Sequence, residues 1–260
     1  MNAQISTSGT NNSGTYSSAV GYQTIASGNY STAMGYQTTA SESYCTAMGY
    51  ATAANGSVST SMGVSTIASG DGSTAMGNQT TASANNSTAM GASTTASGEV
   101  STAMGYATTA SGSSSIAMGL STIANGPNST AMGISTTASG GVSTAIGRST
   151  TASDYGSLVI GHYNSSGSSV TNSATSFSTS NTAFVIGNGT STALSDAFKV
   201  MFNGDVTVSN DLTVVGDVEV QSDARLKSNI VSLGSTLPQL LQIDGKSYEM
   251  KGKQKIGVLA

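Results

Sequence analysis

The stretch "STAMGYQTTASESYCTAMGY", residues 31–50, contains the phrase TAMGY twice, and the two copies start fourteen residues apart. The same interval separates successive glycines along most of the chain, at positions 21, 35, 49, 63, 77, 91, 105, 119, 133, 147 and 161. A short repeat of fixed length is typical of a solenoid, in which each repeat forms one coil stacked on the previous one. Fourteen residues suffice for two strands of about five residues joined by two tight turns. We therefore predict a β-solenoid with one coil per repeat.

The residues of each repeat fall into fixed columns when the periodic glycine is numbered as position 0. Position 3 is threonine and position 5 is alanine in every complete repeat, and position 7 is usually a second glycine, where we expect a turn. Position 10 is serine except at Cys45, and position 12 is alanine except at Ser61 and Val159. Alternate residues of a strand share one face. These small residues are therefore predicted to line a thin interior, with Cys45 as a near-isostere of serine.

Position 13 belongs to the opposite face of its strand and carries large apolar side chains. Eleven such residues in a row would form an exposed apolar stripe about 50 Å long, at roughly 4.8 Å per strand. Soluble monomers rarely expose a patch of this kind, so we expect a second copy of the chain to cover it. Methionine is unbranched and adaptable, and it suits such a seam between subunits. The alternative is that methionine points into the coil of a monomer. The predicted seam consists of Val20, Met34, Met48, Met62, Met76, Met90, Met104, Met118, Met132, Ile146 and Ile160.

Composition and charge exclude several classes of function. Charged residues make up 8% of the chain, and residues 1–147 contain no lysine or arginine. That is too little positive charge to bind a nucleic-acid backbone. No apolar run reaches the length of a membrane span, and residues 1–20 lack the pattern of a secretion signal. We expect no cofactor and no metal site, because His162, the single histidine, has no second ligand at metal spacing.

The repeat S-x-A-x-G-x-x-T-x-A-x-G resembles the head repeats of trimeric autotransporter adhesins. The resemblance covers about residues 8–161, and this chain has methionine where isoleucine or valine is usual in that family. It implies a left-handed parallel β-roll that packs as a homotrimer.

A second, shorter repeat follows the roll. Residues 162–203 are predicted to be a connector with strand signals at 183–189 and 197–204, and residues 204–221 repeat "GDVTVS", "NDLTVV" and "GDVEVQ" with a period of six. Their apolar residues fall on one alternating face, which three chains together could bury as a stem. A simple hairpin meander is the alternative. The residues of this face are Val206, Val208, Leu212, Val214, Val218 and Val220.

The composition changes again at Ser222, where lysine and arginine become frequent. From the residues alone, Ser222 and Asp223 could cap a short helix starting at Ala224. The final residues, "KIGVLA", are predicted to form a strand, so we expect a short α+β segment that is truncated at the chain end.

Residues 222–260 resemble the start of the endosialidase-type intramolecular chaperone, a self-cleaving domain of phage tail spikes and fibres. The matching segments are "SDARLKSNI" and, further on, Leu240, Tyr248 and "IGVLA". The resemblance implies that Ser222 is the nucleophile that cuts the Gln221–Ser222 bond and that Lys227 is its base. A serine hydroxyl needs such a base, and a lysine can act as one only if its pKa is lowered.

Two outward columns of the roll suggest ligand contacts. Tyr22, Tyr36 and Tyr50 share position 1 in consecutive coils and should form a ladder, which could contact glycans or simply cover an edge. Position 4 is rich in threonine and predicts a flat, regular face of the sort used by ice-binding solenoids.

These observations predict an all-β homotrimeric fibre composed of a roll, a connector, a stem and the beginning of a chaperone. The expected function is host attachment as a phage tail fibre or spike in the virion, with a host cell-surface receptor as partner and one self-cleavage as the enzymatic step. The alternatives are a bacterial cell-surface adhesin or filament subunit and an ice-binding solenoid.

Overall fold

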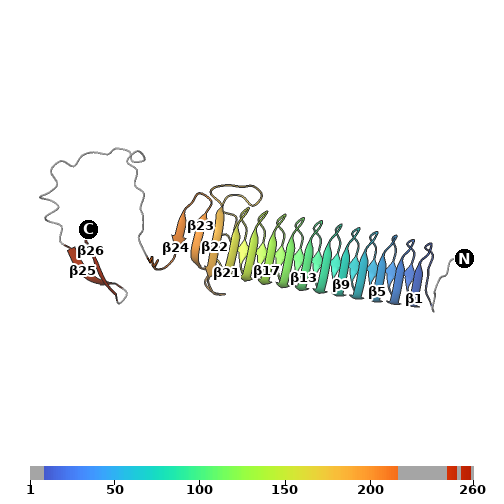
Figure 1. Cartoon of the computed structure of the whole chain (residues 1–260). Coiled ribbons are helices and arrows are strands. Elements are labelled where there is room, and N and C mark those ends of the chain that lie inside the picture. The colour runs from blue at the N-terminus through green and yellow to red at the C-terminus, as the bar shows by residue number, and fades with distance from the viewer. Residues whose placement is uncertain (1–8, 216–244, 251–252, 259–260) are drawn as a thin grey trace. The chain divides into compact units, whose positions relative to one another are not determined.

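The computed structural model describes residues 9–215, 245–250 and 253–258, and its main feature is a parallel β-solenoid (Figure 1). Each coil contributes one five-residue strand to a large sheet, and these strands stack in parallel. This confirms the predicted coil of fourteen residues. The five-residue strands are β1 (Ser18–Tyr22), β3 (Thr32–Tyr36), β5 (Thr46–Tyr50), β7 (Thr60–Val64), β9 (Thr74–Asn78), β11 (Thr88–Ala92), β13 (Thr102–Tyr106), β15 (Ile116–Leu120), β17 (Thr130–Ile134), β19 (Thr144–Arg148) and β21 (Leu158–His162).

The other half of each coil forms a second parallel sheet whose strands are only two residues long, shorter than the five residues expected from the repeat length. Residues at positions 2 and 9 lie in the left-handed backbone region, with φ of 55° at Ser93 and 59° at Val100, so the chain turns twice between successive long strands. Only positions 4 and 5 remain extended. The short strands are β2 (Ile25–Ala26), β4 (Thr39–Ala40), β6 (Ala53–Ala54), β8 (Ile67–Ala68), β10 (Thr81–Ala82), β12 (Thr95–Ala96), β14 (Thr109–Ala110), β16 (Ile123–Ala124), β18 (Thr137–Ala138) and β20 (Thr151–Ala152).

The strands pair in register, so each residue lies beside its equivalent fourteen positions later. Ala33 pairs with Ala47, Met34 with Met48 and Gly35 with Gly49. The hydrogen bonds between coils run along the solenoid, as from the Ile25 amide to the Thr38 carbonyl at 2.8 Å. The sequence columns are therefore columns in space.

The interior contains the small residues predicted for it. The alanines of positions 5 and 12 and Cys45 are fully buried, and so are the threonines of position 3. Burial raises the pKa of the Cys45 thiol, and its sulfur donates a hydrogen bond to the Glu42 carbonyl. The largest fully buried side chains of the roll are the threonines of position 3 and, in the last coil, Val159.

The interior hydroxyl groups differ in their hydrogen bonding. Within the described chain, the Oγ1 atoms of the position-3 threonines lack hydrogen-bond partners in every complete coil except that of Thr66. Thr66 is different because Ser61 replaces alanine at position 12, and their hydroxyl oxygens lie 2.7 Å apart. One substitution in a column thus changes the environment of another column.

The periodic glycine has a steric role. Gly91 has a φ of 119°, and a Cβ atom there would lie 2.0 Å from the carbonyl oxygen of Gly105 in the next coil. No side chain can fit at that distance without moving the backbone, so the spacing between coils requires glycine at position 0.

The large sheet continues beyond residue 161, through the range predicted as a connector. The strand β22 (Thr182–Asn188) pairs in parallel with β21, and Gly161 lies beside Gly187. The antiparallel strands β23 (Asp196–Met201) and β24 (Val206–Val208) then complete the sheet (Figure 1). The two predicted strand signals are confirmed, and β22, β23 and β24 form a meander joined to the end of the roll.

A separate unit contains the last described residues. The strands β25 (Gly245–Met250) and β26 (Lys253–Val258) form an antiparallel hairpin, which confirms the strand expected in the final segment. The helix predicted from Ala224 lies outside the described residues. Among the residues that are described, all regular structure is β-structure.

Candidate interaction surfaces and maturation segment

The residues predicted to form the seam lie on the outer face of the large sheet. Because residues alternate along each strand, position 12 points into the coil and position 13 points out. Met34 is 43% exposed and Ile146 is 38% exposed, whereas the neighbouring Ala33 and Ala145 are fully buried. The structure therefore places the methionine column outside the coil of a single chain, as an apolar stripe, and not in its interior.

The tyrosines of position 1 form the ladder expected from the sequence. The rings of Tyr22 and Tyr36 stack with centroids 5.3 Å apart, and those of Tyr36 and Tyr50 with centroids 5.1 Å apart. The rings face each other, so the central ring offers solvent its edge and hydroxyl group but not a free face. A sugar could therefore stack only on a terminal ring of the ladder.

A second ladder was missed by the sequence reasoning. Tyr16, Tyr30 and Tyr44 occupy position 9 of successive coils, and their rings stack at 5.2 and 5.0 Å. All three are exposed, and all three lie in the left-handed backbone region. Their spacing of fourteen residues was visible in the sequence and could have revealed them. The first coils of the roll thus present two rows of tyrosine hydroxyls.

The end of the roll is closed by polar side chains that the sequence reasoning also missed. Asp154 occupies position 7, where glycine is usual, and is fully buried. Its carboxylate oxygens accept hydrogen bonds from the amides of Thr171 at 2.6 Å and Thr182 at 2.7 Å. Asp154 therefore fixes the middle of the segment that leads from the roll to β22 and the first residue of β22.

Asn164 closes the small sheet in a similar way. It occupies position 3, and its side-chain Oδ1 accepts a hydrogen bond from the Thr151 amide at 2.8 Å, while Nδ2 donates to the Thr151 carbonyl at 2.9 Å. In earlier coils the position-4 amide bonds to the backbone carbonyl of the next position 3. The side chain of Asn164 thus replaces the backbone of a further coil at the edge of β20.

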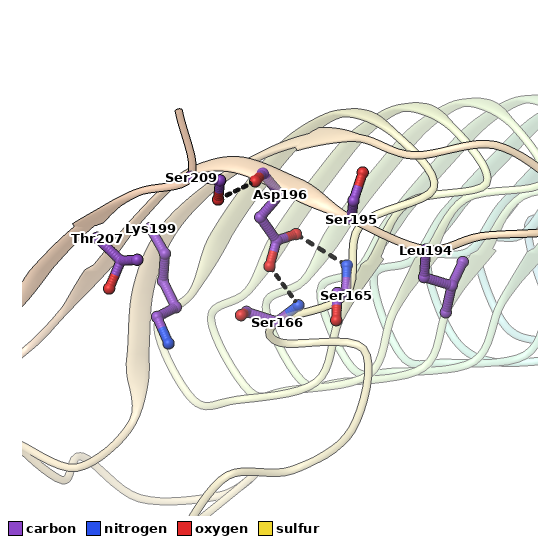
Figure 2. A pocket seen from close by; sticks show the side chains of 8 residues that line it. All are labelled: Ser165, Ser166, Leu194, Ser195, Asp196, Lys199, Thr207 and Ser209. Atoms are coloured by element: carbon purple, nitrogen blue, oxygen red, sulfur yellow. Dashed lines mark hydrogen bonds between the residues drawn. The ribbon is translucent and has the colours of Figure 1, made fainter. Parts of the chain in front are cut away.

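A pocket of about 290 Å³ lies beside the meander (Figure 2). Asp196 holds one wall in place, because its carboxylate accepts hydrogen bonds from the amides of Ser165 at 2.8 Å and Ser166 at 2.7 Å. Lys199 and Thr207 line the pocket from neighbouring strands. This face of the meander is polar, and Asp196 has a structural role in it.

The predicted cleavage site lies outside the described residues. This applies to Gln221, Ser222 and Lys227 alike. Their assignment as scissile residue, nucleophile and base therefore stays a prediction.

Comparison with known families adds two findings. Residues 13–38, 68–94, 96–122, 124–141 and 143–164 match the model described as YadA head domain repeat (2 copies). Residues 222–260 match the model described as chaperone of endosialidase. The roll is thus similar to YadA head repeats, and the last residues of the chain are similar to the chaperone of endosialidase. No curated protein matches the chain.

YadA head repeats belong to trimeric autotransporter adhesins, and the second family supports a self-cleaving chaperone activity. Together the two matches support an adhesive, fibre-type protein that is extracellular or exposed on a surface. Within the described residues, no helix has the length and apolar character needed to cross a membrane.

Proposed function

We propose that this chain is a homotrimeric phage tail fibre or spike that attaches the virion to a host cell surface and matures by self-cleavage. The observation that carries the proposal is the apolar stripe outside the roll, because the interior of each coil is already filled by alanine, serine and threonine. A single chain leaves this stripe partly exposed to water, and contact with two further copies would bury it.

The seam would be formed by the methionine column of each chain facing its equivalents. Burial of apolar surface contributes about 25 cal/mol per Å², so a column repeated in every coil adds a small stabilising contribution per layer. Because the strands of each chain pair in register, equivalent residues of three parallel chains would lie at the same level along the fibre axis. The tyrosine ladders would then lie at the end of the fibre opposite the meander, where a receptor could reach their hydroxyl edges.

The proposed maturation is a single intramolecular reaction. The Ser222 hydroxyl, whose proton passes to the Lys227 amine, attacks the carbonyl carbon of Gln221 and forms an ester as the peptide bond breaks. Water then hydrolyses the ester, which leaves a carboxylate on Gln221 and a free amine on Ser222. Repeats of fixed length can pair in a wrong register, so a chaperone that aligns the three chains would be useful during assembly. Cleavage after assembly would then remove a domain that is no longer needed.

Native mass spectrometry of the product of the complete gene, followed by denaturation of the same sample, tests both parts. We expect a trimer whose chains end at Gln221. Ser222→Ala and Lys227→Ala should each give an uncut trimer. A monomer would overturn the seam, and a wild-type trimer that stays uncut or ends at another residue would overturn the assigned cleavage.

A bacterial cell-surface adhesin is the second candidate function, and the YadA head repeats favour it. Immunogold labelling separates the two candidates, because a fibre protein would label purified virions whereas an adhesin would label the surface of uninfected bacteria.

A further inference from the structure

We propose that the outer face of the meander anchors the trimer, with a second and a third copy of this chain as its partners. This inference rests on the proposed trimer, but it goes further by placing the strongest part of the interface at the meander and not along the roll. It follows from the strand register at the end of the large sheet.

The methionine column continues into the meander without interruption. Ile160 on β21 lies beside Ile186 on β22, Ile186 pairs with Phe198 on β23, and Phe198 pairs with Val208 on β24. Paired residues of neighbouring strands share a face of the sheet. The apolar column of position 13 therefore extends over three more strands than the repeat predicts.

A second apolar column begins at the same place. Leu158 lies beside Phe184, Phe184 pairs with Val200, and Val200 pairs with Val206. This column continues position 11, which is threonine in most coils of the roll. The column of position 11 thus changes from mostly threonine in the roll to large apolar residues on β21 to β24. On the other side of the methionine column, position 1 carries apolar residues in some coils only, such as Val64 and Leu120.

The opposite face of the same strands is polar. Val185 is fully buried at the end of the roll, but the next residues in its column are Lys199 and Thr207, which line the pocket in Figure 2. The sheet of β23 and β24 therefore has one apolar face and one polar face. In the described part of the chain, the apolar face remains half-exposed, and Val206 is 57% exposed.

Two observations favour copies of this chain as the occupant of the apolar face. The face is continuous with the methionine column, so the same axis that brings three columns together would bring three meander faces together. The two columns on these strands also contain no charged residue that a different partner could pair with. Burial of apolar surface drives association, and position 11 adds leucine, phenylalanine or valine on these strands where most coils of the roll have threonine. This added apolar column makes the region the strongest part of the proposed seam.

The experiment compares glutamate substitutions on adjacent residues of one strand. In Val206→Glu, three carboxylates would be brought together at the proposed interface. In the control, Thr207→Glu, the carboxylate would face Lys199 on the polar side. Because Val206 is largely exposed in the single chain, its replacement removes little packing within the monomer. We expect Val206→Glu to raise the concentration of half-dissociation at least tenfold and Thr207→Glu to leave it unchanged, in the full chain.

A variant in the roll separates this inference from the proposed trimer. We expect Met48→Glu to remain trimeric at concentrations where Val206→Glu dissociates. If wild type is trimeric and Val206→Glu is as stable a trimer as Thr207→Glu, the proposal that the meander anchors the trimer is wrong, but the proposed trimer itself is retained. A monomeric wild type would overturn both. Thiol-specific crosslinking gives a readout independent of stability, because Val206→Cys should link chains to each other and Thr207→Cys should not, while Cys45 is buried.

Discussion

At the scale of single residues, the coil depends on backbone conformations that its side chains do not favour. Positions 2 and 9 lie in the left-handed region in every coil, and most of them carry a side chain, such as Ser93 and Val100. Each such residue costs about 1–2 kcal/mol relative to a relaxed backbone. Hydrogen bonds between coils hold these turns, as from the Val100 amide to the Asn85 carbonyl at 3.0 Å.

Alanine at position 0 should be much worse than glycine at position 2. We expect Gly91→Ala to lower the free energy of unfolding by about 3 kcal/mol, because the new Cβ atom would contact the Gly105 carbonyl oxygen. Ser93→Gly, two residues away, should be neutral or stabilise by up to about 1 kcal/mol, because glycine adopts positive φ freely. Chemical denaturation measures both, and equal losses in the two variants would contradict the steric argument.

The buried hydroxyl groups allow a test with opposite signs. We expect Thr80→Val to stabilise the roll by about 1 kcal/mol, because its buried hydroxyl has no partner within the described chain. The same change at Thr66 should destabilise it by about 1 kcal/mol, because the hydrogen bond between the Thr66 and Ser61 hydroxyls would be lost. The Ser61 hydroxyl would keep only its bond to the Thr66 backbone carbonyl at 3.0 Å. Thermal unfolding of the two variants measures both effects. A stabilised Thr66→Val variant would show that the hydrogen bond between Ser61 and Thr66 makes no net contribution to the stability of the roll.

At the scale of elements, the segment between β21 and β22 closes the roll through one carboxylate. The Asp154 carboxylate accepts hydrogen bonds from two backbone amides and is fully buried. Glu42, at the same position of an earlier coil, is exposed. The same column position therefore has a structural role in one coil and a solvent-exposed side chain in another.

Replacing the carboxylate by an amide should open this segment. In Asp154→Asn, one amide donor would face a backbone N–H group, and we expect a loss of about 2 kcal/mol together with faster hydrogen exchange at Thr171 and Thr182. Glu42→Gln is the matched control and should leave both stability and exchange unchanged. Unchanged exchange at Thr171 and Thr182 in Asp154→Asn would remove the closing role from this residue.

The roll could be predicted from the sequence because every layer repeats the same columns, and an alternating pattern of small residues can fill only a thin interior. The short second strand could not, because glutamine, alanine, serine, tyrosine and valine all adopt the left-handed turns that shorten it. The strands β22 and β23 were predicted only as strand signals, since Gly187 does not follow Gly161 at the fixed interval, and a meander was an alternative for residues 204–221 alone. Asp154 replaces the usual glycine of position 7, and Asn164 replaces the threonine of position 3. These two exceptions to the repeat could have indicated that the roll ends there.

At the scale of the whole molecule, the roll is a stack of equivalent layers. Stability in such a stack is close to a sum over layers and their contacts, so the number of layers can change without changing the fold. Layers can be added or removed only as whole repeats of fourteen residues, because any other change in length would place the residues after it in the wrong columns.

Deletion of residues 78–91, one full repeat, should leave a folded roll. It joins Gly77 to Ala92 and retains every column, and we expect one cooperative unfolding transition with a slightly lower midpoint. Deletion of residues 78–84, half a repeat, should abolish cooperative unfolding, because position 0 would then be followed by position 8. Circular dichroism during heating tests both chains, and similar melting curves would contradict the column argument.

The direction of the hydrogen bonds between coils has a mechanical consequence. They run along the solenoid, parallel to a force that pulls the two ends of a chain apart. We expect the coils to separate one at a time under such a force, because each coil is held mainly by its two neighbours. A layer that gives way would release fourteen residues, about 48 Å of extended chain at roughly 3.4 Å per residue. A fibre built this way would absorb a pull by lengthening in equal steps, and optical tweezers would record those steps as a regular sawtooth of force.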